Sequence, residues 1–222
     1  MKVRQAFDAD DDKQPVMVPR SDKALVAVSP ERVRRLREHL VKTLRELRAA
    51  KHLEHVALPM RPEPTGFAAR VARTACSLCK GWCCRNGDDD AFLDDRTLAR
   101  VRLAGPDTTE AAMLRRYLER VPPVAYRESC IFHGKQGCTL DRSMRADVCN
   151  SYYCGGLGAF MKAGSEPTPT KVFAGEGEKL RTSPVLMPQG RYHVGCDPPD
   201  HEGAWPSPEL FAPGCLPRHA KR

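Results

Sequence analysis

Eight of the ten cysteines in this 222-residue chain fall into two short groups, and these groups constrain the fold more than any other feature. The first group consists of Cys76, Cys79, Cys83 and Cys84, and the second of Cys130, Cys138, Cys149 and Cys154. The chain opens with the charged stretch MKVRQAFDADDDK, which lacks the apolar run of a secretion signal, so we expect a cytoplasmic protein. Cytoplasmic thiols are kept reduced, and such spacings there bind metal or carry out redox chemistry more often than they form disulfides.

The spacing of the first group is typical of metal ligation. A C-x2-C pair in a tight turn, here Cys76 and Cys79, can aim two thiolates at one ion, and Gly81 is expected to let the backbone approach the sulfurs. Adjacent residues diverge by about 100° on a helix and point to opposite faces of a strand, so Cys83 and Cys84 poorly suit one tetrahedral ion. The doublet indicates either one ligand beside a packed thiol or ligands to two ions of a multinuclear centre.

Together the eight thiols predict a metal-binding protein that chelates zinc or iron, with an iron–sulfur cluster as one form of the iron. Eight ligands satisfy two all-thiolate zinc sites, one cluster with spare cysteines, or a polynuclear site. An iron–sulfur oxidoreductase or group-transfer enzyme is an alternative, and whether there is any catalytic activity stays open. Ordinary core packing, disulfides and metal-free thiol chemistry are further alternatives, although clustered spacing is not how core thiols are distributed.

At these residues the chain resembles the YkgJ-type cysteine-cluster family, a bacterial family named for its C-x2-C-x2-C-C motif and described as a zinc- or iron-chelating domain. The resemblance covers residues 76–154 and implies metal chelation without implying a reaction. The matching positions of the second group are Cys130 with Ile131 and Phe132, Gly137 with Cys138, Arg145 and Ala146 before Cys149, and Tyr152 before Cys154.

The chain departs from the family pattern at three places. Three residues rather than two separate Cys79 from Cys83, Ala146 stands where proline is usual, and Asn150 stands where arginine is common. The inserted residue affects the expected geometry of the first ligand group.

Composition and local patterns predict an α-rich fold, α+β with little strand, in one small, irregular, metal-stapled domain with short helices. Nineteen prolines and sixteen glycines favour turns, and only 6% of the residues are aromatic, so bound metal would supplement a thin core. We expect a disordered tail at residues 1–28, a basic amphipathic helix at 29–56, the cysteine-cluster domain at 57–164, and a Pro/Gly-rich extension with a hairpin at 165–222.

The clearest helix signal begins at Ser29, an N-cap residue followed by Pro30 and by Glu31 in the first turn. Apolar residues then recur at helical spacing at Val33, Leu36, Leu40, Leu44 and Leu47. Residues 29–55 carry eight basic and four acidic groups, a surplus of four that is half of the net charge of +8. We interpret the segment 29–51 as a helix that packs on the domain, on a second copy or on a protein partner, with solvated basic side chains outside.

The basic helix also supports an alternative function. In it, zinc only stabilises the fold, and the protein is an interaction module that binds a partner through this helix. Basicity alone is not evidence of nucleic-acid recognition, so no nucleic-acid partner is expected. No apolar run approaches the roughly 18 to 20 residues that a membrane-spanning helix requires, so no membrane association is expected either.

Two helices are expected between the cysteine groups, one at residues 95–103 and one from about Asp107, which forms a capping-box pattern with Glu110. His133 is expected to be a solvated turn histidine, residues 88–90 a solvated acidic turn, and the GGLG stretch at 155–158 a tight turn. Four C-terminal residues match no zinc-finger spacing and are expected to be ordinary loop residues. They are His193, Cys196, His201 and Cys215.

Overall fold

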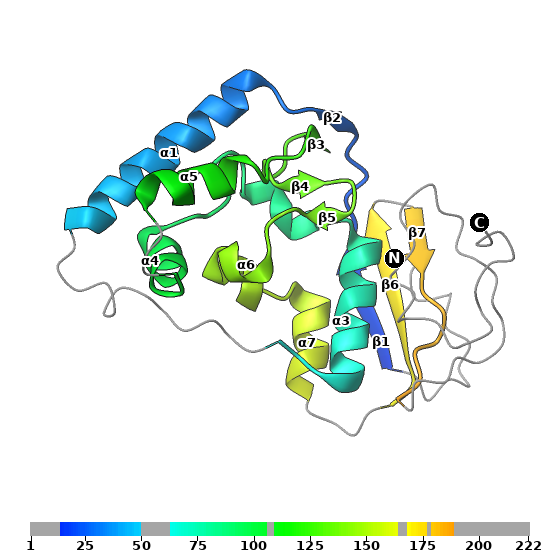
Figure 1. The fold of residues 1–222 in the computed structure, drawn as a ribbon. Coiled ribbons are helices and arrows are strands. Elements are labelled where there is room, and N and C mark those ends of the chain that lie inside the picture. Colours follow the sequence, from blue (N-terminus) through cyan, green and yellow to red (C-terminus); the bar gives the residue numbers. More distant parts are fainter. Residues whose placement is uncertain (1–13, 50–62, 106–108, 164–167, 177–178, 189–222) are drawn as a thin grey trace, which may run out of the picture. The chain divides into compact units, whose positions relative to one another are not determined.

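A computed structural model describes residues 14–49, 63–105, 109–163, 168–176 and 179–188 of the chain (Figure 1). These residues form six α-helices and a few short strands, so the fold is α+β with more helix than strand. The chain divides into two compact units rather than the one that the sequence predicts. Unit 1 comprises Met1–Arg20, Pro64–Cys79 and Tyr153–Arg222, and unit 2 comprises Ser21–Glu63 and Lys80–Tyr152. The expected cysteine-cluster domain at 57–164 is therefore shared between the two units.

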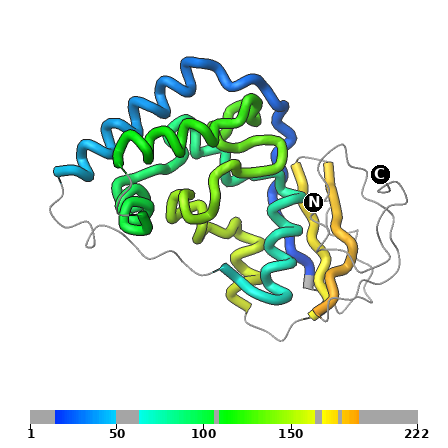
Figure 2. The backbone as a smooth tube through the Cα atoms, in the orientation of Figure 1, coloured from blue at the N-terminus to red at the C-terminus, as the bar shows by residue number. Residues whose placement is uncertain are grey.

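Unit 1 is built on a three-stranded sheet. The central strand β6 (Thr170–Glu176) pairs in parallel with β1 (Gln14–Pro19) and antiparallel with β7 (Lys179–Thr182), as the tube in Figure 2 shows. Helices α3 (Gly66–Cys79) and α7 (Gly155–Ala163) contact β1, and α3 also contacts β6. Strand β6 includes the stretch KVFA at residues 171–174, whose β-branched and aromatic residues favour a strand.

The expectation of a disordered tail is wrong for residues 14–27. They include β1 and a second strand, β2 (Leu25–Ala27), which pairs with β3 (Val124–Tyr126) in unit 2. Both strands find their partners far along the chain, and a local sequence pattern carries no information about such pairing. Residues 1–13 lie outside the described residues, as do residues 189–222 of the extension in which a hairpin is expected.

The tight turn expected at residues 155–158 is the first part of α7 instead. A Cβ atom at Gly156 would lie 1.7 Å from the carbonyl oxygen of Met17. The glycine thus lets this helix approach the backbone of β1 closely, which is a packing role and not a turn role.

Unit 2 is organised around α1 (Pro30–Ala49), which confirms the predicted helix as far as the described residues extend. The Ser29 hydroxyl accepts a hydrogen bond from the Arg32 N–H at 3.3 Å, as expected of an N-cap. The buried residues of α1 include the four leucines of the predicted apolar face, Leu36, Leu40, Leu44 and Leu47. Val33 packs against this core while partly exposed.

Helices α4 (Asp95–Leu103) and α5 (Glu110–Leu118) both contact α1. The bounds predicted for α4 are confirmed, and Asp94 caps it by accepting from the Thr97 N–H at 2.9 Å. The cap of α5 is Thr109, whose hydroxyl accepts from the Ala112 N–H at 3.2 Å, and the predicted cap Asp107 lies outside the described residues.

The rest of unit 2 consists of short elements, and the five cysteines of this unit lie in them or in the loops between them. In chain order they are the 3₁₀-helix η2 (Trp82–Asn86), β3, the strand pair β4 (His133–Gly134) and β5 (Gly137–Cys138), the 3₁₀-helix η3 (Arg142–Met144) and α6 (Asp147–Ser151). Gly134 and Gly137 pair with each other at the turn of the β4–β5 hairpin. In the described parts of the chain, no helix has both the length and the apolar character needed to cross a membrane.

Candidate functional site

The eight predicted ligands are divided between the two units, and none of the eight forms a disulfide. Unit 2 holds Cys83 and Cys84 on η2, Cys130 before β4, Cys138 at the end of β5, and Cys149 in α6. Unit 1 holds Cys76 and Cys79 on the last turn of α3, and Cys154 just before α7. The four C-terminal candidates lie outside the described residues. They are His193, Cys196, His201 and Cys215.

The first pair, Cys76 and Cys79, lies on a helix and not in the expected tight turn. Gly81 follows with a left-handed backbone, φ 65°, but its missing side chain does not serve the sulfurs as predicted. A Cβ atom at Gly81 would lie 2.4 Å from Nε2 of His133. This glycine therefore makes room for an imidazole ring.

Backbone contacts hold three of the five unit 2 cysteines in place. The Cys130 N–H donates to the Cys84 carbonyl at 2.9 Å, and the His133 N–H donates back to the Cys130 carbonyl at 2.8 Å. The β4–β5 pairing sets His133 opposite Cys138. Gly87 approaches Cys130 so closely that a Cβ atom there would lie 2.9 Å from the Cys130 Cβ. Segments that are 46 positions apart, at Cys84 and Cys130, are thus joined directly.

Arg100 of α4 holds the segment that leads into Cys149. Its guanidinium donates to the Ser143 carbonyl at 2.6 Å, to the Arg145 carbonyl at 2.7 Å and to Asp147 Oδ1 at 3.1 Å. Arg100 cannot be recognised as a positioning residue from the sequence, because a solvent-exposed arginine has the same local sequence pattern.

The unit 2 thiols influence one another electrostatically. The Cys84 thiol hydrogen-bonds to Cys83, which lowers the pKa of Cys83 to about 7 and raises the pKa of Cys84. Burial, with smaller contributions from the neighbouring Cys138 and Cys149, raises the pKa of Cys130 to about 12. These interactions connect all five cysteines into one neighbourhood, in which ionisation of each thiol opposes ionisation of the next.

Two arginines counter this mutual repulsion. Burial raises the pKa of Cys149 to about 11, and Arg145 opposes that rise, while Arg32 has the same opposing effect on Cys130. Positive charge therefore already stands beside two of the five thiols.

The side chains do not converge on one point as they lie. Among the residues that the structure describes, no three His, Cys, Asp or Glu side chains form a group that could hold a metal ion. The donor type and the shared neighbourhood suit a soft metal, whereas the present side-chain directions do not enclose one.

His133 is buried, so the expectation of a solvated turn histidine is wrong. Its Nδ1 lies 2.8 Å from the Ser129 hydroxyl oxygen, and its ring centroid lies 4.6 Å from that of Tyr126. Burial lowers the pKa of His133 to about 4, so the imidazole is neutral at neutral pH. The ring fills the space between Gly81 and the β4–β5 hairpin.

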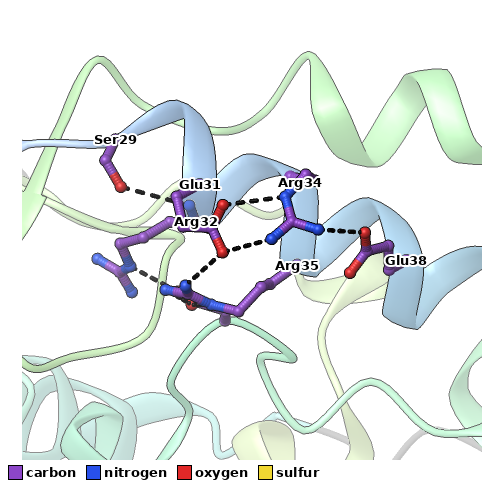
Figure 3. A network of polar contacts seen from close by, with 7 residues as sticks. Ser29, Glu31, Arg32, Arg34, Arg35 and Glu38 are labelled. Atoms are coloured by element: carbon purple, nitrogen blue, oxygen red, sulfur yellow. Dashed lines mark hydrogen bonds and ion pairs between the residues drawn. The ribbon is translucent and has the colours of Figure 1, made fainter.

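The acidic turn at residues 88–90 is also not solvated throughout, because Asp89 is buried. Arg32 donates to Asp89 Oδ1 at 2.5 Å, and Arg35 reaches Oδ2 at 2.6 Å. Figure 3 shows the neighbouring network on α1, in which Arg34 binds both Glu31 and Glu38. Much of the positive charge of α1 is therefore neutralised within the protein.

A hollow of about 600 Å³ lies along the outer face of α1 between Arg34 and Glu46. Its lining is mostly charged, with basic and acidic side chains interspersed, and it includes none of the cysteines. The hollow therefore gives no support to a site beside the thiols.

Comparison with protein-family models, with curated proteins and with solved structures gave no match. The resemblance to the YkgJ-type family stays a prediction from the cysteine spacing.

Proposed function

We propose that this protein is a metal-binding protein that chelates zinc or iron through its clustered cysteines. The observation that carries the proposal is the gathering of five free thiols from four separate segments in one neighbourhood of unit 2. They are Cys83, Cys84, Cys130, Cys138 and Cys149. We keep Cys76, Cys79 and Cys154 in the proposed ligand set on their sequence spacing alone.

The chemistry of crowded thiols supports this proposal. Burial and neighbouring thiols raise the pKa of Cys130 and Cys149, so neither thiol ionises readily without compensation. A bound divalent cation supplies that compensation, because coordination deprotonates a thiol outright. Thiolate ligation suits both zinc and iron, so the donor set does not choose between them.

Chelation requires movement of the thiols, since the described side chains do not converge. Rotation about the Cα–Cβ bond of exposed Cys83 and Cys149 meets less resistance than rotation of buried Cys130. Metal binding that also orders the surrounding segments contributes its binding free energy to folding. Removal of the metal is therefore expected to lower the thermal midpoint of the protein.

The test is the zinc, iron and acid-labile sulfide content of full-length protein purified without oxygen. We expect bound zinc or iron in the wild type and its loss when Cys84, Cys130 and Cys138 are all replaced by serine. The matched control replaces Cys196 and Cys215, which are outside the proposed ligand set, and retains the metal. A metal-free wild type whose thermal midpoint is unchanged by chelators would disprove the proposal.

The same measurement separates the two forms of the metal centre. Iron with acid-labile sulfide and visible charge-transfer absorption favours an iron–sulfur cluster, and with it a role in electron or group transfer. Zinc in a colourless protein favours a structural or storage role, because zinc has no redox chemistry.

A further inference from the structure

The outer face of α1 is charged, with one apolar residue in its middle. The four buried leucines of the helix pack in the core of unit 2, whereas the side chains at positions 34, 37, 38, 42, 45 and 46 are exposed. Val41 lies among these charged residues, is half-buried and does not belong to the core. The hollow described above is lined by this face of α1 alone.

The hollow has the form of two adjoining holes of the kind that receive side chains when one helix packs on another. Four residues of a helix surround each such hole, at spacings of three, four and seven positions. The residues around the first hole are Arg34, Arg37, Glu38 and Val41, and those around the second are Glu38, Val41, Lys42 and Arg45. Val41 is the short residue shared by both holes, and the long charged side chains form their rims.

Two of the guanidinium groups on the rims are free to bind a partner. Arg34 is already held by Glu31 and Glu38, as Figure 3 shows. Arg37 and Arg45, by contrast, form no ion pair and donate no side-chain hydrogen bond within the described part of the chain. Unlike the other arginines of this helix that bind carboxylates, these two keep their charge available on the surface.

The spacing of these two arginines indicates the shape of what they fit. They lie eight positions apart, which corresponds to about 12 Å along the helix axis, and Val41 lies halfway between them. On a facing helix, two carboxylates seven or eight positions apart span the same distance, and an apolar residue midway between them falls opposite Val41. The face therefore suits an acidic amphipathic helix.

Two other occupants fit less well. The hollow is lined by four basic and two acidic residues, for a net charge of +2, so a second copy of α1 would bring like charges together. A nucleic acid would bring its phosphates close to Glu38 and Glu46, and Val41 offers it no hydrogen bond. Both alternatives are outcomes of the test below.

We propose that the outer face of α1 binds an acidic amphipathic helix of another protein. An apolar side chain of this helix packs on Val41, and two of its carboxylates pair with Arg37 and Arg45. This inference does not depend on the metal binding proposed above, because the hollow contains none of the cysteines.

The test uses full-length protein and a fluorescein-labelled peptide of three heptads. The peptide has leucine at the first and fourth positions of each heptad and glutamate beside them, and a staple on its opposite face makes it helical before binding. A second peptide has glutamine in place of every glutamate. We expect fluorescence anisotropy to show binding of the acidic peptide that weakens with added salt, and binding of the glutamine peptide that is at least roughly tenfold weaker.

The variants locate the binding surface. The double variant Arg37→Glu/Arg45→Glu should weaken binding of the acidic peptide at least roughly tenfold, and Val41→Gln should weaken it to a smaller extent. The matched control is Arg73→Glu/Arg96→Glu, which makes the same change of charge at two exposed arginines of α3 and α4 and should bind as the wild type does. The neutral variant Arg37→Gln/Arg45→Gln replaces the reversed one if circular dichroism shows that the reversed one does not fold.

Three results would overturn the proposal. The first is absence of binding of the acidic peptide, or equal binding by the wild type and the Arg37/Arg45 variants. The second is tighter binding of a single-stranded oligonucleotide with the same dependence on Arg37 and Arg45, which would assign the face to nucleic acid. The third is a dimer of the wild type in sedimentation that Arg45→Glu dissociates, which would assign the face to a second copy of the chain. Metal content enters none of these results, so they leave the proposed metal binding unaffected.

Discussion

Gly81 shows how a single absent side chain shapes the region of the thiols. Its φ of +65° is one that L side chains rarely adopt, and a Cβ atom would lie 2.4 Å from His133 Nε2. Gly66 has a similar φ of +57° but has no neighbouring atom within 4 Å of the same position. Substitution of both glycines by alanine therefore separates the cost of backbone strain from the cost of displacing a neighbouring side chain.

We predict that Gly81→Ala destabilises the protein more than Gly66→Ala. Backbone strain alone costs about 1 to 2 kcal/mol, and displacement of a buried ring adds about 1 to 3 kcal/mol. Urea denaturation of both variants gives the two free energies of unfolding. Equal losses would mean that the His133 ring moves aside at no cost.

The burial of His133 also leads to a prediction about how the stability of the protein depends on pH. Its pKa is lowered to about 4 by burial, against an ordinary value of 6.5, so folding favours the neutral imidazole. The stability that this preference contributes is complete above pH 6.5 and is lost as the pH falls toward 4, up to about 3 kcal/mol.

Titration of the histidine Cε1 protons by NMR tests this directly. One resonance, absent from His133→Gln, should titrate near pH 4 in the folded protein. Titration of the His133 resonance near pH 6.5 would contradict the prediction and would mean that the ring is hydrated.

At the level of secondary structure, α1 is joined to the loop after η2 by one buried carboxylate. Asp89 binds Arg32 and Arg35, and Arg32 also donates to the Ser129 carbonyl at 2.6 Å. Ser129 directly precedes Cys130, so α1 contacts both the loop that follows Cys84 and the segment that leads into Cys130. The exposed pair of Arg34 and Glu38 on the same helix offers a matched control.

We predict that Asp89→Asn lowers the free energy of unfolding by about 3 kcal/mol, because Arg32, whose side chain is mostly buried, loses its carboxylate partner. Arg35 keeps its ion pair with Glu31. Glu38→Gln should lower it by no more than about 0.5 kcal/mol, the value of an exposed i,i+4 pair. Chemical denaturation of both variants measures the difference. Similar small effects would show that solvent compensates for the lost Asp89 charge.

Local signals explain which elements the sequence could predict. Helices α1 and α4 follow from caps at Ser29 and Asp94 and from apolar periodicity, all contained within a few turns. Helix α3 has the same kind of periodicity in Phe67 and Val71, but the prolines before it and the C-x2-C spacing within it are typical of loops and turns. The strands β1 and β2 could not be predicted, because their pairing partners are distant in sequence.

For the whole molecule, the cysteine spacing identified the candidate metal ligands. It did not predict how these ligands are distributed between the two units. Cys79 ends α3 of unit 1, whereas Cys83 lies on η2 of unit 2, although only three residues separate them. The division into units depends on which core each segment joins, and that is decided by contacts across the chain. Convergence of all eight thiols on one centre stays a prediction.

The two cores also lead to a prediction about cooperativity. Val16 of β1 is 1% exposed in unit 1, whereas its neighbour Met17 is 37% exposed, as alternation along a strand requires. Val16→Ala should cost about 2 kcal/mol, because it removes buried methyl groups beside Val172 of β6. Met17→Ala should cost little.

Amide hydrogen exchange of the folded protein shows which elements are destabilised by Val16→Ala. If each unit unfolds around its own core, Val16→Ala will accelerate exchange of the β6 amides and leave the buried amides of α1, such as that of Leu40, at their wild-type rates. Met17→Ala will leave both sets unchanged. Equal acceleration in β6 and α1 would mean that the two units unfold as one cooperative body, and metal lost from unit 2 would then destabilise the sheet of unit 1 to the same extent.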